Sequence, residues 1–266
     1  MPDHLSALGV PIAVVTMYVA QRIERRLGAA AAGWFAALPI AFGVAAATIA
    51  VTVGRSDASL VAMSAVGHAG PMVAYAVAFV LLTTRLGALR GFVLAALVYG
   101  LASVAVVPIS EPVRIGIGVV CIALGTAFMA RRPGATRLGQ EATTTQQILS
   151  LASAGVVVAV ITMANHYSGP ELAGAVGAFP TMTTTIALFV AYRAGARNAG
   201  PVMGGMVRSL PIYVVYCLAF AFLITRTSAL VAVVGAGCLA LGTAMLTWRK
   251  VERVDLRMHR LLVAEP

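Results

Sequence analysis

The chain has 266 residues, of which 60% are hydrophobic and only 11% are charged, and its mean hydropathy is +0.93. No soluble domain of this size can bury so much apolar surface, so the composition excludes a soluble globular protein and indicates a polytopic membrane protein. The net charge of +10 is then a property of short loops and not a nucleic-acid signal. The three cysteines, Cys121, Cys217 and Cys238, lie in apolar runs and show no disulfide pattern.

Nine apolar runs are long enough to cross a bilayer, which predicts an all-α integral membrane protein with nine transmembrane helices. The first run is not a cleavable signal peptide, because its basic cluster of Arg22, Arg25 and Arg26 follows the apolar stretch. That order predicts an N-terminus outside the cell. The predicted helices are residues 7–22, 30–53, 60–83, 89–108, 113–130, 147–165, 171–192, 201–225 and 229–248.

The loops support this orientation. With the N-terminus outside, 15 of the 19 Lys and Arg residues fall on the cytoplasmic side. Arg55, Arg114 and Arg226 are expected outside, and Arg208 lies within a span. Since cytoplasmic loops of membrane proteins are rich in Lys and Arg, the sequence predicts a multi-pass protein of the inner (plasma) membrane with a cytoplasmic C-terminus.

A shift of 141 positions aligns the two halves without a gap, from Gly33 with Gly174 to Leu89 with Leu230. Five predicted helices precede the second copy, and an odd number reverses its direction through the bilayer. The sequence therefore predicts a five plus four inverted-topology repeat, an architecture typical of secondary transporters. The expected parts are a first repeat (1–131), a cytoplasmic linker (132–146), a second repeat (147–248) and a cytoplasmic tail (249–266).

Pro39 in AALPIAFG and Pro180 in GAFPTMTTT lie at matched positions near the starts of two predicted helices. A proline removes a backbone donor, and inverted-repeat transporters often bind substrate where helices are broken. The alternative is a proline in a first helical turn, where it costs nothing. Four hydroxyls that suit ligand coordination follow, although threonines also bond back to their own helix: Thr181, Thr183, Thr184 and Thr185.

Arg208 stands in the otherwise almost wholly apolar run 200–225. A charge at such depth costs ~2.5 kcal/mol or more, so an intramembrane ionisable residue marks a functional site by default. The interiors of the spans offer no Asp or Glu as a partner, so the expected partner is an anion. The alternative is that Arg208 snorkels to the headgroups.

His68 overlays one position from Arg208 when the two halves are compared, and it is the in-membrane group suited to proton coupling near neutral pH. Its alternative role is that of a neutral histidine bonded to a neighbour. Tyr75 and Tyr216 follow on the same two helices and complete the predicted binding site, with simple packing as the alternative.

The stretch GAFPTMTTTIALFVAYRAGARNAGPVMGGMVRSLPIYVVYCLAF resembles the GlpM family of small bacterial inner-membrane proteins. The shared features are a Phe-Pro-Thr helix start, a basic loop and a helix with a Pro-Tyr element. The resemblance covers the second half, and more faintly the first, as in a duplicated protein. It implies a phosphate-bearing or polymer-precursor ligand and supplies no catalytic residues.

These patterns predict a secondary transporter of a small anionic solute that binds at the midplane between the repeats. The alternatives are a flippase for an anionic lipid and a non-transporting membrane scaffold. An enzyme is not expected, because the sequence has no nucleotide-binding or metal motif and no paired buried carboxylates. No cofactor or metal is expected. The expected partners are membrane lipid and a small anion or lipid headgroup, with no nucleic acid, and a homodimer is compatible with the sequence.

Overall fold

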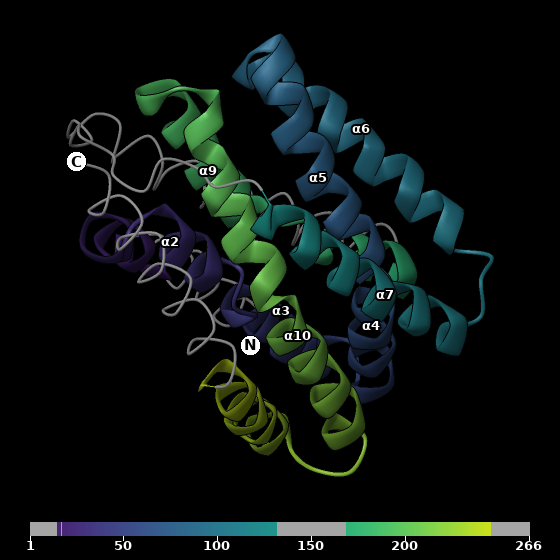
Figure 1. The fold of residues 1–266 in the computed structure, drawn as a ribbon. Helices are drawn as coiled ribbons and strands as arrows, with labels where there is room; N and C mark the ends of the chain where they lie inside the picture. Colours follow the sequence, from purple (N-terminus) through teal and green to yellow (C-terminus); the bar gives the residue numbers. More distant parts are fainter. Residues whose placement is uncertain (1–14, 17, 132–168, 246–266) are drawn as a thin grey trace.

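The structure is a computed structural model that describes residues 15, 16, 18–131 and 169–245 (Figure 1). Within those ranges every regular element is a helix. Backbone polar groups in hydrocarbon must be paired inside the protein, and a helix pairs them within one segment. The all-α class predicted from composition is therefore confirmed.

Five described helical segments are long and apolar enough to cross a membrane, as expected of a membrane protein. The predicted helix 147–165 and most of 7–22 lie outside the described residues, so the count of nine stays a prediction. The five segments are Ala69–Leu86, Ala88–Val106, Glu111–Ala130, Gly169–Ala194 and Ala196–Ile224, and Ala229–Met245 is a shorter apolar helix.

The predicted helices 30–53 and 171–192 each consist of two pieces, which the sequence pattern did not reveal. Pro39 and Pro180 stand at the N-cap of the second piece in each case. A proline cannot donate to the preceding turn and collides with it, so the helix ends before the proline and begins again after it. The pieces are α2 (Ala29–Ala36) and α3 (Ile40–Thr52) in the first half, and residues 169–178 and α9 (Thr181–Ala194) in the second.

The predicted helix 60–83 is also two helices, α4 (Arg55–Gly67) and α5 (Ala69–Leu86), which meet at His68. The backbone of His68, at φ −91° and ψ 7°, leaves the helical range there. The corresponding part of the second half has no such break, even though Pro211 lies inside its long helix. That part consists of the 3-10 helix η1 (Ala196–Ala199) and α10 (Gly200–Ile224).

The long helix α10 occupies the centre of the fold and packs against α2, α4, α5 and α7 (Glu111–Ala130). The helices α6 (Ala88–Val106) and α7 lie toward the outside (Figure 1). On α6, Leu101 and Val104 are each 72% exposed. Large apolar side chains exposed along a spanning helix are suited to contact with lipid.

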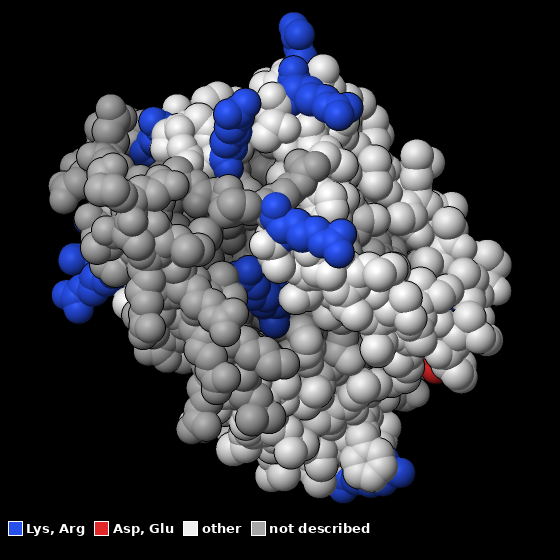
Figure 2. Space-filling view, in the orientation of Figure 1, with Lys and Arg blue, Asp and Glu red and all other residues white. Residues whose placement is uncertain are grey.

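Basic side chains dominate the charged groups on the face shown in Figure 2. Among the described residues a single ion pair is present, in which Arg193 at the end of α9 contacts Glu24 at 2.6 Å. Burial raises the pKa of the Glu24 carboxyl, and the Arg193 guanidinium opposes that rise. The pair joins the segment after the first predicted helix to the end of α9, which agrees with the expectation that both lie on one side of the membrane.

Candidate functional site

The two helix breaks have the same backbone geometry. Pro39 caps α3 with φ −75° and Pro180 caps α9 with φ −80°, and both prolines are buried. The matching backbone bonds run from Leu38 to Phe35 (3.1 Å) and Ile40 to Leu38 (2.8 Å), and from Phe179 to Val176 (3.2 Å) and Thr181 to Phe179 (2.8 Å). The first turns of α3 and α9 thus begin inside the protein, where a helix N-terminus favours a negative group.

The threonines after Pro180 divide into two kinds. Thr185 donates to the carbonyl of Thr181, which is itself partly buried, at 3.0 Å. Thr184 donates to the carbonyl of Pro180 at 2.7 Å. Thr183 is fully buried, and its hydroxyl has no hydrogen-bond partner among the described residues. Back-bonding to the helix therefore explains two of these hydroxyls, while Thr183 keeps a hydroxyl available for another polar group.

Tyr75 on α5 and Tyr216 on α10 occupy equivalent places in the two halves. The Tyr75 hydroxyl lies 2.7 Å from Thr184 Oγ1. Because Thr184 already donates to a carbonyl, Tyr75 is the donor of this bond. The Tyr216 hydroxyl lies against Gly43, in the space that a Cβ on that residue would need. It has no hydrogen-bond partner among the described residues, so it presents a polar group to the first turn of α3.

Residues that are 141 positions apart make matching contacts between the halves. The Val202 carbonyl lies against Gly33, and the Val61 carbonyl lies against Gly174, so closely that neither glycine has room for a Cβ. Each of these contacts is made twice, once by each half. Three further pairs follow the same spacing: Ala30–Gly205 with Glu171–Ser64, Gly43–Tyr216 with Thr184–Tyr75, and Val80–Gly200 with Ala221–Ser59.

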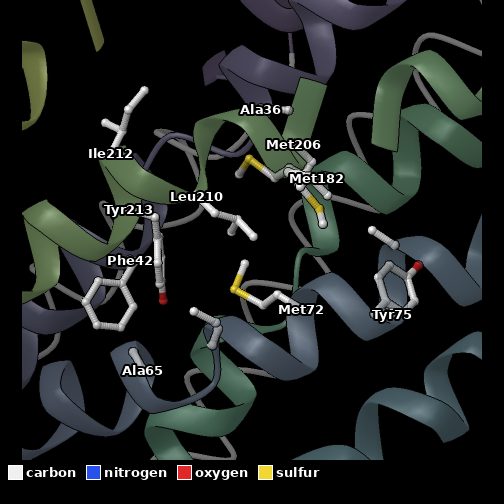
Figure 3. Close-up of a cluster of buried hydrophobic side chains, with 14 of the residues drawn as sticks. Ala36, Phe42, Ala65, Met72, Tyr75, Met182, Met206, Leu210, Ile212 and Tyr213 are labelled. Carbon is white, nitrogen blue, oxygen red and sulfur yellow. The ribbon is translucent and has the colours of Figure 1, made fainter. Parts of the chain in front are cut away.

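Methionine side chains fill the space between the halves. Figure 3 shows Met72 of α5, Met182 of α9 and Met206 of α10 converging beside Leu210, with Tyr213 on the other side of Leu210. All three methionines are buried. Methionine is unbranched and adapts its shape at little cost, so this interface can repack more easily than one made of branched side chains.

His68 is grouped with α7 and not with the threonines. It is 1% exposed, and its Nδ1 lies 2.7 Å from the Ser64 carbonyl, while its Nε2 has no partner among the described residues. Arg114 on α7 is only 6% exposed, and a Cβ on Gly67 would lie 3.4 Å from its Nε. The sequence analysis placed Arg114 in an external loop and missed it as a site residue. Its position four residues after Ser110 gave no signal of burial.

Arg208 is partly buried on α10 and makes an interaction in the structure. Its candidacy therefore rests on its charge and its depth, and not on the lack of a partner. In the register of 141 residues the counterpart of His68 is Ser209, which is buried and donates to the carbonyl of Met206 at 2.7 Å. The structure thus brings Tyr75 to Thr184 and Tyr216 to the turn after Pro39, and it brings His68 to Arg114.

No group of three or more His, Cys, Asp or Glu residues that could hold a metal ion occurs among the described residues. Comparisons with known proteins found no matching family model, no similar curated protein and no similar solved structure. The resemblance to the GlpM family therefore stays a prediction, and the argument for function rests on the geometry of the chain itself.

Proposed function

We propose that this protein is a secondary transporter of a small anionic solute, built from two inverted repeats in the inner membrane with its N-terminus outside. The observation that carries the proposal is the set of contacts made twice at a spacing of 141 residues. Two of the positive-φ glycines of one half, Gly28 and Gly54, also have positive-φ counterparts, Gly169 and Gly195. A pseudo-two-fold relation between the halves accounts for all of these pairs together.

Alternating access needs two states in which the halves exchange their roles. Inverted repeats provide them, because an asymmetric arrangement of two similar halves has a mirror-related counterpart that opens to the other side. The halves differ in this way at one matched contact. The Tyr75 hydroxyl is bonded to Thr184, whereas the Tyr216 hydroxyl lies on Gly43 without a partner among the described residues. The methionine interface between the halves supports such repacking.

The anionic class of the solute follows from the groups at the breaks. The N-termini of α3 and α9 favour a negative ligand. Hydroxyls of Thr183 and Tyr216 are buried beside those turns and can donate to an anion. Arg208 supplies a permanent positive charge on α10, and its planar guanidinium suits carboxylate or phosphate oxygens. Acidic side chains that would repel an anion are not among these groups.

The test is a thermal-unfolding screen of the purified protein against small carboxylates, phosphate esters and inorganic anions, each with a neutral analogue. A ligand that binds the folded state alone raises the unfolding temperature by mass action. The best ligand is then followed by counterflow into proteoliposomes. Arg208→Gln should lose both stabilisation and uptake, and Arg208→Lys should weaken them. The matched control is Arg226→Gln, because Arg226 is exposed and contacts only its own helix end through Phe222 and Thr225.

Three results would contradict the proposal. Full uptake by Arg208→Gln would remove the anion site. Scrambling of a fluorescent anionic lipid in the same vesicles, without solute uptake, would favour a flippase. The absence of both activities, together with stabilisation by no anion, would favour a membrane scaffold.

A further inference from the structure

We propose that Arg114 and His68 form a second site, which binds a small monovalent anion together with one proton. The site lies where α4 and α5 meet and α7 packs against them. It is separate from the groups at Pro39 and Pro180. Binding at this site does not depend on the proposed transport function, although any part that it plays in coupling does.

The guanidinium of Arg114 is the anion-binding group. Its Nε and Nη1 are buried, and neither has a hydrogen-bond partner among the described residues. An arginine keeps its charge in proteins and carries only donors. Buried donors of a charged group are normally bonded, and a buried charge is normally paired. An anion beside Nε and Nη1 would satisfy both requirements at once.

His68 supplies the proton. The partner of its Nδ1 is the Ser64 carbonyl, which can only accept, so Nδ1 carries a hydrogen and donates. In the neutral ring Nε2 is then an acceptor without a hydrogen. An anion can receive a hydrogen bond from Nε2 only after the ring has gained a proton from solvent. If the ligand enters as the neutral acid instead, its own hydrogen bonds to Nε2. Both routes add one proton and one anion to the site.

Two charged groups bear on the titration of His68. Arg114 disfavours the protonated ring and the carboxylate of Glu171, from the helix of residues 169–178, favours it. A bound anion offsets the repulsion from Arg114, so anion and proton should each tighten the binding of the other. The linkage is reciprocal, and its sign is fixed by these charges.

The ligand is expected to be small. His68 and Arg114 are almost fully buried, and the residues around them are among the smallest in the chain. A Cβ on Gly118 of α7 would lie 3.3 Å from the Cβ of Ala69, and a Cβ on Gly70 would lie 3.6 Å from Ile117. With one permanent charge and one proton at the site, a monovalent anion of the size of a halide fits best.

The experiment uses the purified full-length chain with sodium bromide as the probe and sodium gluconate as the bulky reference at equal ionic strength. Bromide should raise the unfolding temperature more at pH 5.5 than at pH 7.5. Above the pH at which His68 is half protonated, the apparent affinity should fall up to about tenfold for each pH unit, as expected for uptake of one proton. Arg114→Gln should lose the stabilisation, and His68→Gln should keep a weaker effect without the pH dependence.

The control variant is Arg226→Gln, whose bromide effect should equal that of the wild type. Loss of the bromide effect in Arg208→Gln, with the effect kept in Arg114→Gln, would place bromide at the proposed transport site and overturn this inference alone. If Arg114→Gln does not fold, crystals of the wild type soaked in bromide give the answer. An anomalous peak beside Arg114 Nε and His68 Nε2 is expected, and peaks only elsewhere would overturn the site. A bromide effect that is equal at both pH values would refute the proton.

Discussion

Alanine substitution at Gly33 tests the close contact between the halves. Gly33 lies within α2, and an added Cβ would sit 2.7 Å from the Val202 carbonyl carbon and closer still to its oxygen. Gly174, its counterpart, would place a Cβ 2.8 Å from the Val61 oxygen and nearer to Ser64. Ordinary contacts of a Cβ begin at 3.4 Å, so in both variants the backbones must separate.

The expected cost follows from two opposing terms. Overpacking a tight contact costs typically 1–3 kcal/mol, and here backbone atoms must move, which favours the upper end of that range. Alanine is a better helix former than glycine by about 1 kcal/mol, which offsets part of the cost. The net destabilisation should be about 2 kcal/mol for each variant, or roughly 4–8 °C in unfolding temperature for a chain of this size.

The assay is thermal unfolding in detergent, with Gly100→Ala and Gly242→Ala as controls. A Cβ on either control glycine meets nothing within 4 Å, so these variants should be neutral or slightly stabilised. Gly33→Ala and Gly174→Ala should also be destabilised by similar amounts, because they disturb equivalent contacts. Stability of Gly33→Ala equal to that of Gly100→Ala would refute the close approach of α2 and α10.

The tyrosine pair should respond unequally: Tyr75→Phe should lose about 1 kcal/mol of stability through its bond to Thr184, and Tyr216→Phe should lose less, because its hydroxyl has no partner among the described residues. Equal losses in chemical unfolding would contradict this asymmetry. Arg193→Gln should destabilise the protein at neutral pH by leaving the Glu24 carboxylate buried without its partner. Since burial raises the pKa of Glu24 in the folded state, protonation relieves the cost, so the deficit should shrink as the pH falls toward the ordinary carboxyl range. A deficit that is constant between pH 5 and pH 8 would contradict this account.

The positions of several elements could be predicted from the sequence because they depend on local composition. The apolar runs at 89–108 and 113–130 correspond closely to α6 and α7. The shift of 141 residues found the pairs Pro39 with Pro180 and Tyr75 with Tyr216, and the structure places both members of each pair in equivalent surroundings.

Other features depend on contacts between distant segments and could not be predicted. The break at His68 lies in a run that is apolar on both sides, so its hydropathy shows no interruption. Thr183 and Thr184 are adjacent and chemically alike, and only the approach of Tyr75 from α5 distinguishes them. Arg114 resembles a loop arginine in sequence, and its burial results from the packing of α4 against α7.

The inverted relation of the two halves is the central claim, because alternating access depends on it. Ser56 and Arg197 are 141 positions apart and both are exposed, so they report the two sides directly. Single cysteines at these positions are made in a background without Cys121, Cys217 and Cys238, and intact cells are treated with an impermeant thiol reagent. Ser56→Cys should react from outside, and Arg197→Cys should react only after the cells are permeabilised. Reaction of both from the same side would show parallel halves and contradict the account.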